Sequence, residues 1–307
     1  MSAPFNLIAV IGPTASGKTS FAAHLADEID GEVISADSRQ VYRNMNLGTG
    51  KDYEDYRVQD RQVPFHLIDI IEPGNRYSVF EFQRDFFKAF DRIRSQGKMP
   101  ILCGGSGMYI EAATRGYRLV EVPRNDMLRH ELQFRSLQEL EEILAGMKTL
   151  HNRTDVDTVD RAVRAIEIES YYRANPGSTS GLPAVYPLFF GIMYDRTTER
   201  SRITERLESR LKRGMVSEVQ QLLASGITPE SLDYYGLEYR YITAYLTGRL
   251  DYPTMVKQLN TAIHQFARRQ RTWFRKMERN GIGIHWIDGA IPLEKKLETV
   301  RRMLDRC

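Results

Sequence analysis

The sequence predicts an α/β fold in which helices flank a parallel β-sheet and a small all-helical domain is inserted into the chain. Three observations predict it. Short apolar runs alternate with helical patterns over residues 1–115, and a glycine-rich turn follows the first of these runs. A leucine-rich stretch in the middle of the chain shows only helical patterns. The alternation predicts the sheet and its covering helices, and the leucine-rich stretch predicts the insertion.

The expected strands are short apolar runs bounded by polar or turn-forming residues. In chain order they are residues 7–11, 32–36, 65–70, 99–103, 188–193 and 282–287. Between the third and the fourth strand, Val79, Phe82, Phe86 and Phe90 recur at helical spacing, and Ser78 stands where an N-cap residue is expected. Helices that separate consecutive strands are typical of a parallel sheet.

The helical insertion is expected at residues 116–160, so the core comprises residues 1–115 and 161–307. The apolar residues of this stretch have helical spacing, and they are Leu128, Leu132, Leu137, Leu140 and Leu144. A stretch rich in Pro, Gly and Ser, residues 175–187, then leads back to the fifth strand.

Composition excludes several classes of protein. The net charge is only +3, so the chain as a whole is not a polycation. Its two cysteines, Cys103 and Cys307, lie far apart, which excludes a disulfide framework and a cysteine-rich zinc module. No apolar stretch approaches the roughly 20 residues needed to cross a bilayer, and the chain shows no basic leader with a cleavage site. We therefore expect a cytoplasmic protein without a membrane partner.

The glycine-rich turn carries the strongest motif. It matches G-x-x-x-x-G-K-[ST] between an expected strand and an expected helix, and its residues are Gly12, Pro13, Thr14, Ala15, Ser16, Gly17, Lys18 and Thr19. Backbone amides of such a loop surround phosphate oxygens, the lysine adds charge, and the threonine hydroxyl can bind Mg²⁺. The motif predicts a P-loop NTPase-like sheet that binds a polyphosphate, without indicating which one.

Polar residues lie at or after the ends of three of the expected strands. Asp37 follows the second strand, Asp69 lies at the end of the third, and Ser106 lies in a glycine turn after the fourth. The carboxyl ends of parallel strands face the ligand crevice, so these side chains are expected to converge beside the phosphate loop. A lone Asp37 would more simply cap a turn, but the convergence favours an active site.

Two helices are expected to present rows of basic residues. In the first, residues 259–279, one face holds His264, Arg268, Arg271, Arg275 and Arg279, and the opposite face holds Leu259, Ile263, Phe266, Trp273 and Met277. The second places Arg202, Arg206, Arg210 and Arg213 in line. Rows of arginine suit an RNA backbone or a pyrophosphate. Gln270 interrupts the apolar face, so we expect it to be hydrogen-bonded in the core or to contact a ligand.

Together these motifs resemble the bacterial tRNA dimethylallyltransferases, also called tRNA isopentenyltransferases (the IPP transferase family). The resemblance covers nearly the whole chain, and the segments that carry it are residues 12–19, 35–42, 48–51, 66–69, 104–109, 161–167 and 267–275. It implies transfer of a dimethylallyl group from dimethylallyl pyrophosphate to the exocyclic amine of the tRNA adenosine just 3′ of the anticodon, with release of pyrophosphate.

The resemblance also implies roles for individual residues. Asp37 would be the general base, and Ser106 would stand where the family usually has threonine. Lys18, Thr19 and Arg206 would face the pyrophosphate, with Thr19 as a ligand of Mg²⁺. The insertion would clasp the anticodon stem-loop of a monomeric enzyme. The residues expected to contact tRNA are Asp37, Ser38, Arg39, Gln40, Ser106, Arg129, Asp160, Arg161, Arg164, Arg268, Arg271 and Arg275.

Two other functions compete with this interpretation. A P-loop kinase of a nucleoside or small metabolite would use the same loop for ATP and could use Asp37 as its base. A non-catalytic RNA-binding module would account for the basic helices, but it leaves the phosphate loop and Asp37 unexplained. The basic helices and the full series of motifs favour the transferase.

Overall fold

The computed structural model describes residues 5–117, 119, 121–148, 156–175 and 181–305. Cys307 and part of the stretch at 175–187 lie outside these residues. The chain forms two compact units, which we call the core unit (Met1–Tyr117 with Pro183–Cys307) and the insertion unit (Arg118–Leu182).

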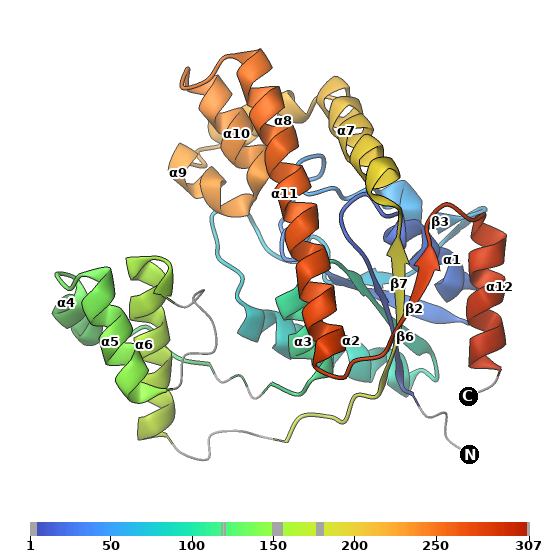
Figure 1. Cartoon of the computed structure of the whole chain (residues 1–307), viewed down its shortest axis with the longest axis horizontal. Helices are drawn as coiled ribbons and strands as arrows, with labels where there is room; N and C mark the ends of the chain where they lie inside the picture. The colour runs from blue at the N-terminus through green and yellow to red at the C-terminus, as the bar shows by residue number, and fades with distance from the viewer. Residues whose placement is uncertain (1–4, 118, 120, 149–155, 176–180, 306–307) are drawn as a thin grey trace. The chain divides into compact units, whose positions relative to one another are not determined.

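The core unit contains a six-stranded sheet in which every pair of neighbouring strands is parallel (Figure 1). In sheet order its strands are β5 (Phe65–His66), β2 (Gly31–Ala36), β6 (Met99–Gly104), β1 (Leu7–Ile11), β7 (Pro187–Met193) and β8 (Ile284–Asp288). All residues of the central β1 and of β2 are buried, as expected for a sheet covered on both faces. The α/β fold predicted from the sequence is confirmed.

Two of the expected strands are shorter than predicted. β5 ends at His66 and not at Ile70, and β8 begins at Ile284 and not at Ile282. The backbone at Leu67 and Asp69 has φ angles of 62° and 54°. This left-handed conformation cannot continue a strand, so β5 stops after two residues.

Helices of the core unit cover the sheet and extend beyond its carboxyl edge. They are α1 (Lys18–Glu28), α2 (Val79–Ser95), α3 (Gly107–Thr114), α7 (Arg196–Lys212), α8 (Met215–Ala224), α9 (Pro229–Leu232), α10 (Leu237–Leu246), α11 (Tyr252–Arg279) and α12 (Leu293–Leu304). The core unit also contains two short 3₁₀ helices and one hairpin. They are η1 (Tyr53–Tyr56), η3 (Asp233–Tyr235) and the hairpin of β3 (Arg57–Val58) and β4 (Arg61–Gln62). Ser78 caps α2 through a capping box with Glu81, as the sequence predicted for Ser78.

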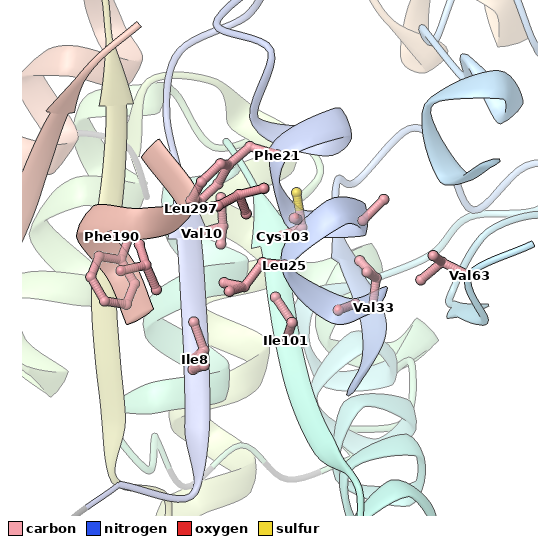
Figure 2. Packing of buried hydrophobic residues seen from close by; sticks show 14 of the residues in the cluster. Ile8, Val10, Phe21, Leu25, Val33, Val63, Ile101, Cys103, Phe190 and Leu297 are labelled. Carbon is pink, nitrogen blue, oxygen red and sulfur yellow. The ribbon is translucent and has the colours of Figure 1, made fainter. Parts of the chain in front are cut away.

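One apolar cluster anchors the first helix against the sheet. Phe21 and Leu25 of α1 pack with Ile8 of β1, Ile101 of β6 and Leu297 of α12 (Figure 2). All five side chains are at most 5% exposed. Burial on this scale holds the start of α1, and therefore the loop that precedes it, in a fixed place above β1.

The insertion unit consists of α4 (Asp126–Leu132), α5 (Leu137–Met147) and α6 (Val159–Ala174). Its core joins Leu140 and Leu144 of α5 to Ala162 and Ile166 of α6. The insertion unit therefore extends past the predicted boundary at residue 160, because the apolar stripe of α6 packs against α5. The unit ends at Leu182.

Candidate active site

The glycine-rich loop lies between β1 and α1, where the sequence placed it. Gly17 adopts a left-handed conformation with φ of 76° directly before the first residue of α1. A Cβ atom on Gly12 would lie 2.6 Å from the Ile192 carbonyl oxygen and 2.7 Å from Ser16 Oγ, so only glycine fits there. The loop thus opens at a helix N-terminus, where backbone amides and the helix dipole favour an anion.

Two polar side chains of this loop, those of Lys18 and Ser16, lack a strong partner among the described residues. Lys18 Nζ donates a long hydrogen bond of 3.3 Å to the Pro13 carbonyl oxygen. Burial lowers the pKa of Lys18, and the positive charge of Arg206 lowers it further. Ser16 Oγ is buried and has no hydrogen-bond partner among the described residues. A bound anion would provide the missing partner for both side chains.

Arginines of α7 line the loop on its other side. Arg202 Nε donates to the Ala15 carbonyl oxygen at 3.0 Å, and Arg206 Nη1 donates to Thr14 Oγ1 at 3.3 Å. Desolvation lowers the pKa of Arg206 to about 10, with Arg210 contributing, so Arg206 is still a cation at neutral pH. The structure therefore places Arg206 beside the phosphate loop, and its contact with pyrophosphate stays a prediction.

Asp52 is a member of this arginine cluster that the sequence analysis missed. Its Oδ2 accepts hydrogen bonds from Arg210 at 2.9 Å and from Arg206 at 3.4 Å, and its Oδ1 lies 3.6 Å from Arg213 Nη1. Arg210 is buried, with 7% of its surface exposed. Asp52 thus contacts three guanidinium groups beside the loop, and the carboxylates of Asp55 and Glu238 also lie near Arg206 and Arg210.

Asp37 and Ser106 lie in the turns that follow the carboxyl ends of neighbouring strands β2 and β6. Asp37 Oδ1 accepts a hydrogen bond of 2.8 Å from the Arg39 backbone N–H, so it does cap the turn while using only one carboxylate oxygen for it. The Ser38 backbone N–H donates to Ser106 Oγ at 3.3 Å. A Cβ atom on Gly104 would lie 2.4 Å from the Ala36 carbonyl oxygen, which explains the glycine before this turn.

Asp69 does not join this group, contrary to expectation. Its two carboxylate oxygens accept hydrogen bonds from Lys51 Nζ and from the Tyr53 hydroxyl. The early end of β5 and the left-handed turns at Leu67 and Asp69 direct the side chain to the loop at residues 46–53. Asp69 therefore holds that loop in place, and the lysine it pairs with is buried.

The loop at residues 46–48 is held by a second carboxylate that sequence reasoning missed. Glu218 of α8 accepts hydrogen bonds from the backbone N–H groups of Asn46, Leu47 and Gly48 at 2.9, 2.7 and 3.0 Å. The Tyr239 hydroxyl donates to Glu218 at 2.7 Å. No local pattern marks Glu218, because its partners lie about 170 residues earlier in the chain.

The two residues after Ser38 already have partners in the core unit. Gln40 Nε2 donates to the Gly50 carbonyl oxygen at 3.0 Å, and Gln40 Oε1 accepts from Ser35 Oγ at 3.1 Å. The Arg39 guanidinium lies 4.8 Å from the centre of the Tyr234 ring, which is a cation–π contact. Both residues order the turn that contains Asp37, and their contacts with tRNA stay a prediction.

The basic row of α11 is only partly free. Arg268 and Arg275 are exposed, whereas Arg271 Nη1 lies 3.3 Å from Glu199 Oε2 of α7 and its side chain is 20% exposed. The row contains no acid of its own, but a neighbouring helix supplies one. Arg271 therefore joins α11 to α7, and Arg268 and Arg275 are the better candidates for RNA contact.

The buried face of α11 differs from the predicted one at its centre. Its buried residues are Met255, Leu259, Ala262, Ile263, Ala267, Gln270, Phe274 and Met277, while Phe266 is 38% exposed. The predicted burial of Phe266 was wrong, because the helix turns its small Ala267 toward the neighbouring elements. Gln270 is hydrogen-bonded inside the core, as expected.

In the insertion unit, two predicted tRNA-binding arginines have a structural partner. Arg129 Nε and Nη2 donate to the two carboxylate oxygens of Glu167 at 3.0 and 2.9 Å, and Arg164 also donates to Glu167. Burial alone would raise the pKa of Glu167, but these bonds and the Asn125 N–H lower it to about 2. Asp160 and Arg161 are exposed at the start of α6. Contact of these four residues with tRNA stays a prediction.

Comparison with known proteins agrees with this geometry. The family model described as IPP transferase matches residues 40–277. The chain belongs to the IPP transferase family. It is 55% identical over 301 residues to tRNA dimethylallyltransferase 1 of Parabacteroides distasonis, covering 98% of both chains. It is 56% identical over 300 residues to tRNA dimethylallyltransferase 2 of Bacteroides fragilis, again covering 98% of both.

A solved member of the IPP transferase family has the same architecture. The tRNA isopentenylpyrophosphate transferase of Bacillus halodurans superimposes with a TM-score of 0.71 at 29% identity, covering 98% of this chain and 95% of that one. The fold predicted from the sequence is therefore the fold of the family. None of the helices in the described part of the chain combines the length and the apolarity needed to cross a bilayer.

Proposed function

We propose that this IPP transferase transfers a dimethylallyl group from dimethylallyl pyrophosphate to the exocyclic amine of the adenosine just 3′ of the anticodon, position 37 of the tRNA, and that it acts in the cytoplasm. One observation carries the proposal most directly. A loop suited to a polyphosphate and the Asp37–Ser106 pair lie at the carboxyl ends of adjacent strands of one sheet. The leaving group and the proton acceptor can therefore serve the same reaction.

The proposed reaction exchanges one bond to carbon for another. The C–O bond to pyrophosphate breaks and leaves its electron pair on the departing oxygen. The lone pair of the adenine amine forms the new C–N bond, and its proton passes to Asp37. The loop amides, Lys18 and Arg206 stabilise the charge that develops on pyrophosphate, in the manner of an oxyanion hole. Ser106 beside the Asp37 turn can hold the adenine amine in line with the allylic carbon.

Magnesium would enter this site together with the pyrophosphate. No group of three or more His, Cys, Asp or Glu side chains in the described part of the chain is arranged to hold a metal. The protein itself supplies the Thr19 hydroxyl, so most ligands of Mg²⁺ would be pyrophosphate oxygens and water. The ion would neutralise negative charge on the leaving group.

The direct test of this function compares two donors. We expect purified protein to transfer label from dimethylallyl pyrophosphate to tRNA, and the modified nucleoside to be detected by mass spectrometry after digestion. The same preparation should transfer no phosphoryl group from labelled ATP to nucleosides. Phosphoryl transfer without prenyl transfer would establish the kinase and reject the proposal.

Asp52→Asn is expected to strengthen the binding of inorganic pyrophosphate by roughly threefold to tenfold. The substitution removes the negative charge that pairs with Arg206, Arg210 and Arg213. Titration calorimetry with Mg²⁺ present measures the effect. Asp60→Asn is the control, since Asp60 is exposed in the turn of the β3–β4 hairpin. Weaker pyrophosphate binding in Asp52→Asn would instead make Asp52 a scaffold that orders the arginines.

Replacing both Arg268 and Arg275 by Ala is expected to weaken tRNA binding and to reduce its salt dependence. If each arginine contacts a phosphate, the slope of log K against log[salt] should fall by about one for each residue removed. Filter binding at several salt concentrations measures this slope. Arg92→Ala with Arg94→Ala is the matched control, because both are exposed on α2 and the charge change is equal. An unchanged slope would identify the row on α11 as a solvated surface.

A further inference from the structure

Gln270 of α11 joins the phosphate loop to the turn that carries Ser106. Its Oε1 accepts a hydrogen bond of 2.8 Å from the Thr14 backbone N–H, and its Nε2 donates one of 3.0 Å to the Gly105 carbonyl oxygen. The residue is buried, with 7% of its surface exposed. One side chain thus bonds the backbones of two loops that follow different strands.

The chemistry of the amide group fixes this bridge in one orientation. A backbone N–H can only donate and a carbonyl oxygen can only accept. A flipped side-chain amide would therefore lose both hydrogen bonds and place donor against donor and acceptor against acceptor. An unsatisfied buried polar group is costly, which keeps the side chain in place. Asparagine is one methylene shorter and could not reach both loops from the same helix position.

Close backbone contacts support the same bridge. A Cβ atom on Gly105 would lie 2.4 Å from Gln270 Nε2 and 2.9 Å from the Gly12 carbonyl oxygen. One turn further along α11, Trp273 packs so closely that a Cβ atom on Gly107 would lie 2.2 Å from its Cδ1. The two residues that flank Ser106 are therefore both held against α11. Glycine is required at each of them for this approach.

We propose that Gln270 is a positioning residue, which fixes the spacing between the pyrophosphate-binding loop and the Ser106–Asp37 side of the site. This inference rests on the proposed function, in which one loop binds the donor and the other side accepts the proton. Transfer requires the allylic carbon and the amine nitrogen to come within about 3–3.5 Å of each other, and a displacement of about 1 Å can cost roughly 10²-fold in rate. Gln270 contacts neither reactant and acts through the two loops.

The test uses Gln270→Met, which keeps the length of the side chain and removes both hydrogen bonds. We expect the single-turnover rate at saturating donor and tRNA to fall about 10- to 100-fold. The KM values for both substrates should stay within about threefold of wild type, because each loop keeps its own binding groups. A purely structural role would lower the folded fraction and the reaction amplitude, but it would leave the saturating single-turnover rate constant of the folded protein unchanged.

Gln83→Met is the matched control for the loss of a buried glutamine. Gln83 is 3% exposed, and its Nε2 donates to the carbonyl oxygens of Ala112 and Tyr117, away from both loops. We expect Gln83→Met to lower the melting temperature and to retain the wild-type rate in the folded protein. Equal losses of rate in Gln83→Met and Gln270→Met would overturn the proposal, as would a Gln270→Met rate within twofold of wild type.

A second variant keeps the proposal testable if Gln270→Met does not fold. Gly105→Ala keeps glutamine at position 270, but its methyl group forces the Gln270 amide or the Gly12 carbonyl oxygen to shift and so disturbs the bridge. It should lower turnover with little change in KM, and an unchanged turnover would contradict the positioning role. Wild-type protein is assayed in parallel, so that failure of the proposed function appears as absence of prenyl transfer in every sample.

Discussion

Asp37→Asn is expected to lower the single-turnover rate of prenyl transfer by roughly 10²-fold or more, while tRNA affinity stays within about twofold of wild type. The amine of adenine must lose a proton as its new C–N bond forms, and a neutral amide cannot accept that proton. The amide oxygen of the substituted side chain can still accept the hydrogen bond from the Arg39 backbone N–H, so the turn after β2 should be preserved. Rapid-quench assays with labelled donor measure the rate, and filter binding measures the affinity.

A comparison with Asp37→Ala separates the loss of the proton acceptor from the loss of the hydrogen bond that caps the turn. Alanine removes the proton acceptor and also the hydrogen bond that caps the turn. Any loss of rate in Asp37→Ala beyond that in Asp37→Asn therefore measures the contribution of the turn. Asp60→Asn serves as the surface control and should retain the wild-type rate. Substantial turnover in Asp37→Asn would mean that another group, or solvent, receives the proton.

The parts of the fold that the sequence predicted are those encoded locally. The five residues of β1 are all apolar, and the phosphate loop follows them directly, so strand, loop and helix could be located from adjacent residues. Ser78 marks the start of α2 in the same way, because its capping box uses a residue only three positions later. Local signals of this kind do not depend on which distant segments pack together.

The errors arose where packing partners decide the structure. The apolar stripe of α6 is compatible with a sheet or with other helices, and its contact with Leu140 and Leu144 determines that it belongs to the insertion unit. Phe65–Ile70 has the pattern of one strand, but left-handed turns at Leu67 and Asp69 end it early. Neither residue is a glycine, so no local signal in the sequence indicates these turns.

The sequence indicated charged residues of the candidate site, but it did not indicate which of them contact one another. Gln270 and Thr14 are 256 positions apart, and Arg210 and Asp52 are 158 apart. No periodicity or spacing rule links such residues, because their contact depends on the complete tertiary fold. The sequence therefore indicated Asp37, Lys18 and Arg206 as site residues, whose roles stay predictions, and it missed Asp52 and Glu218, which contact the neighbouring groups.

Lys18→Met is expected to reduce kcat/KM for the donor by roughly 10²- to 10³-fold, with most of the loss in kcat. Among the described residues, Lys18 Nζ donates one long hydrogen bond of 3.3 Å, to the Pro13 carbonyl oxygen, a partner that an incoming pyrophosphate can replace. Negative charge on pyrophosphate grows as the C–O bond breaks, so a cation at this position binds the transition state more tightly than the substrate. Methionine keeps most of the side-chain volume inside the loop and removes the charge.

The double variant of Lys18→Met with Arg206→Gln tests whether the two cations act on the same leaving group. Arg206 donates to Thr14 Oγ1 on the same loop, so both charges face one pyrophosphate. Groups that act together on one charge are not additive, and we expect the double variant to lose less rate than the product of the two single losses. Steady-state and single-turnover assays of all three variants give the required comparison. Only the loss of an interaction made in the transition state lowers kcat. An unchanged kcat with a raised KM in Lys18→Met would therefore show that Lys18 binds pyrophosphate without stabilising its departure.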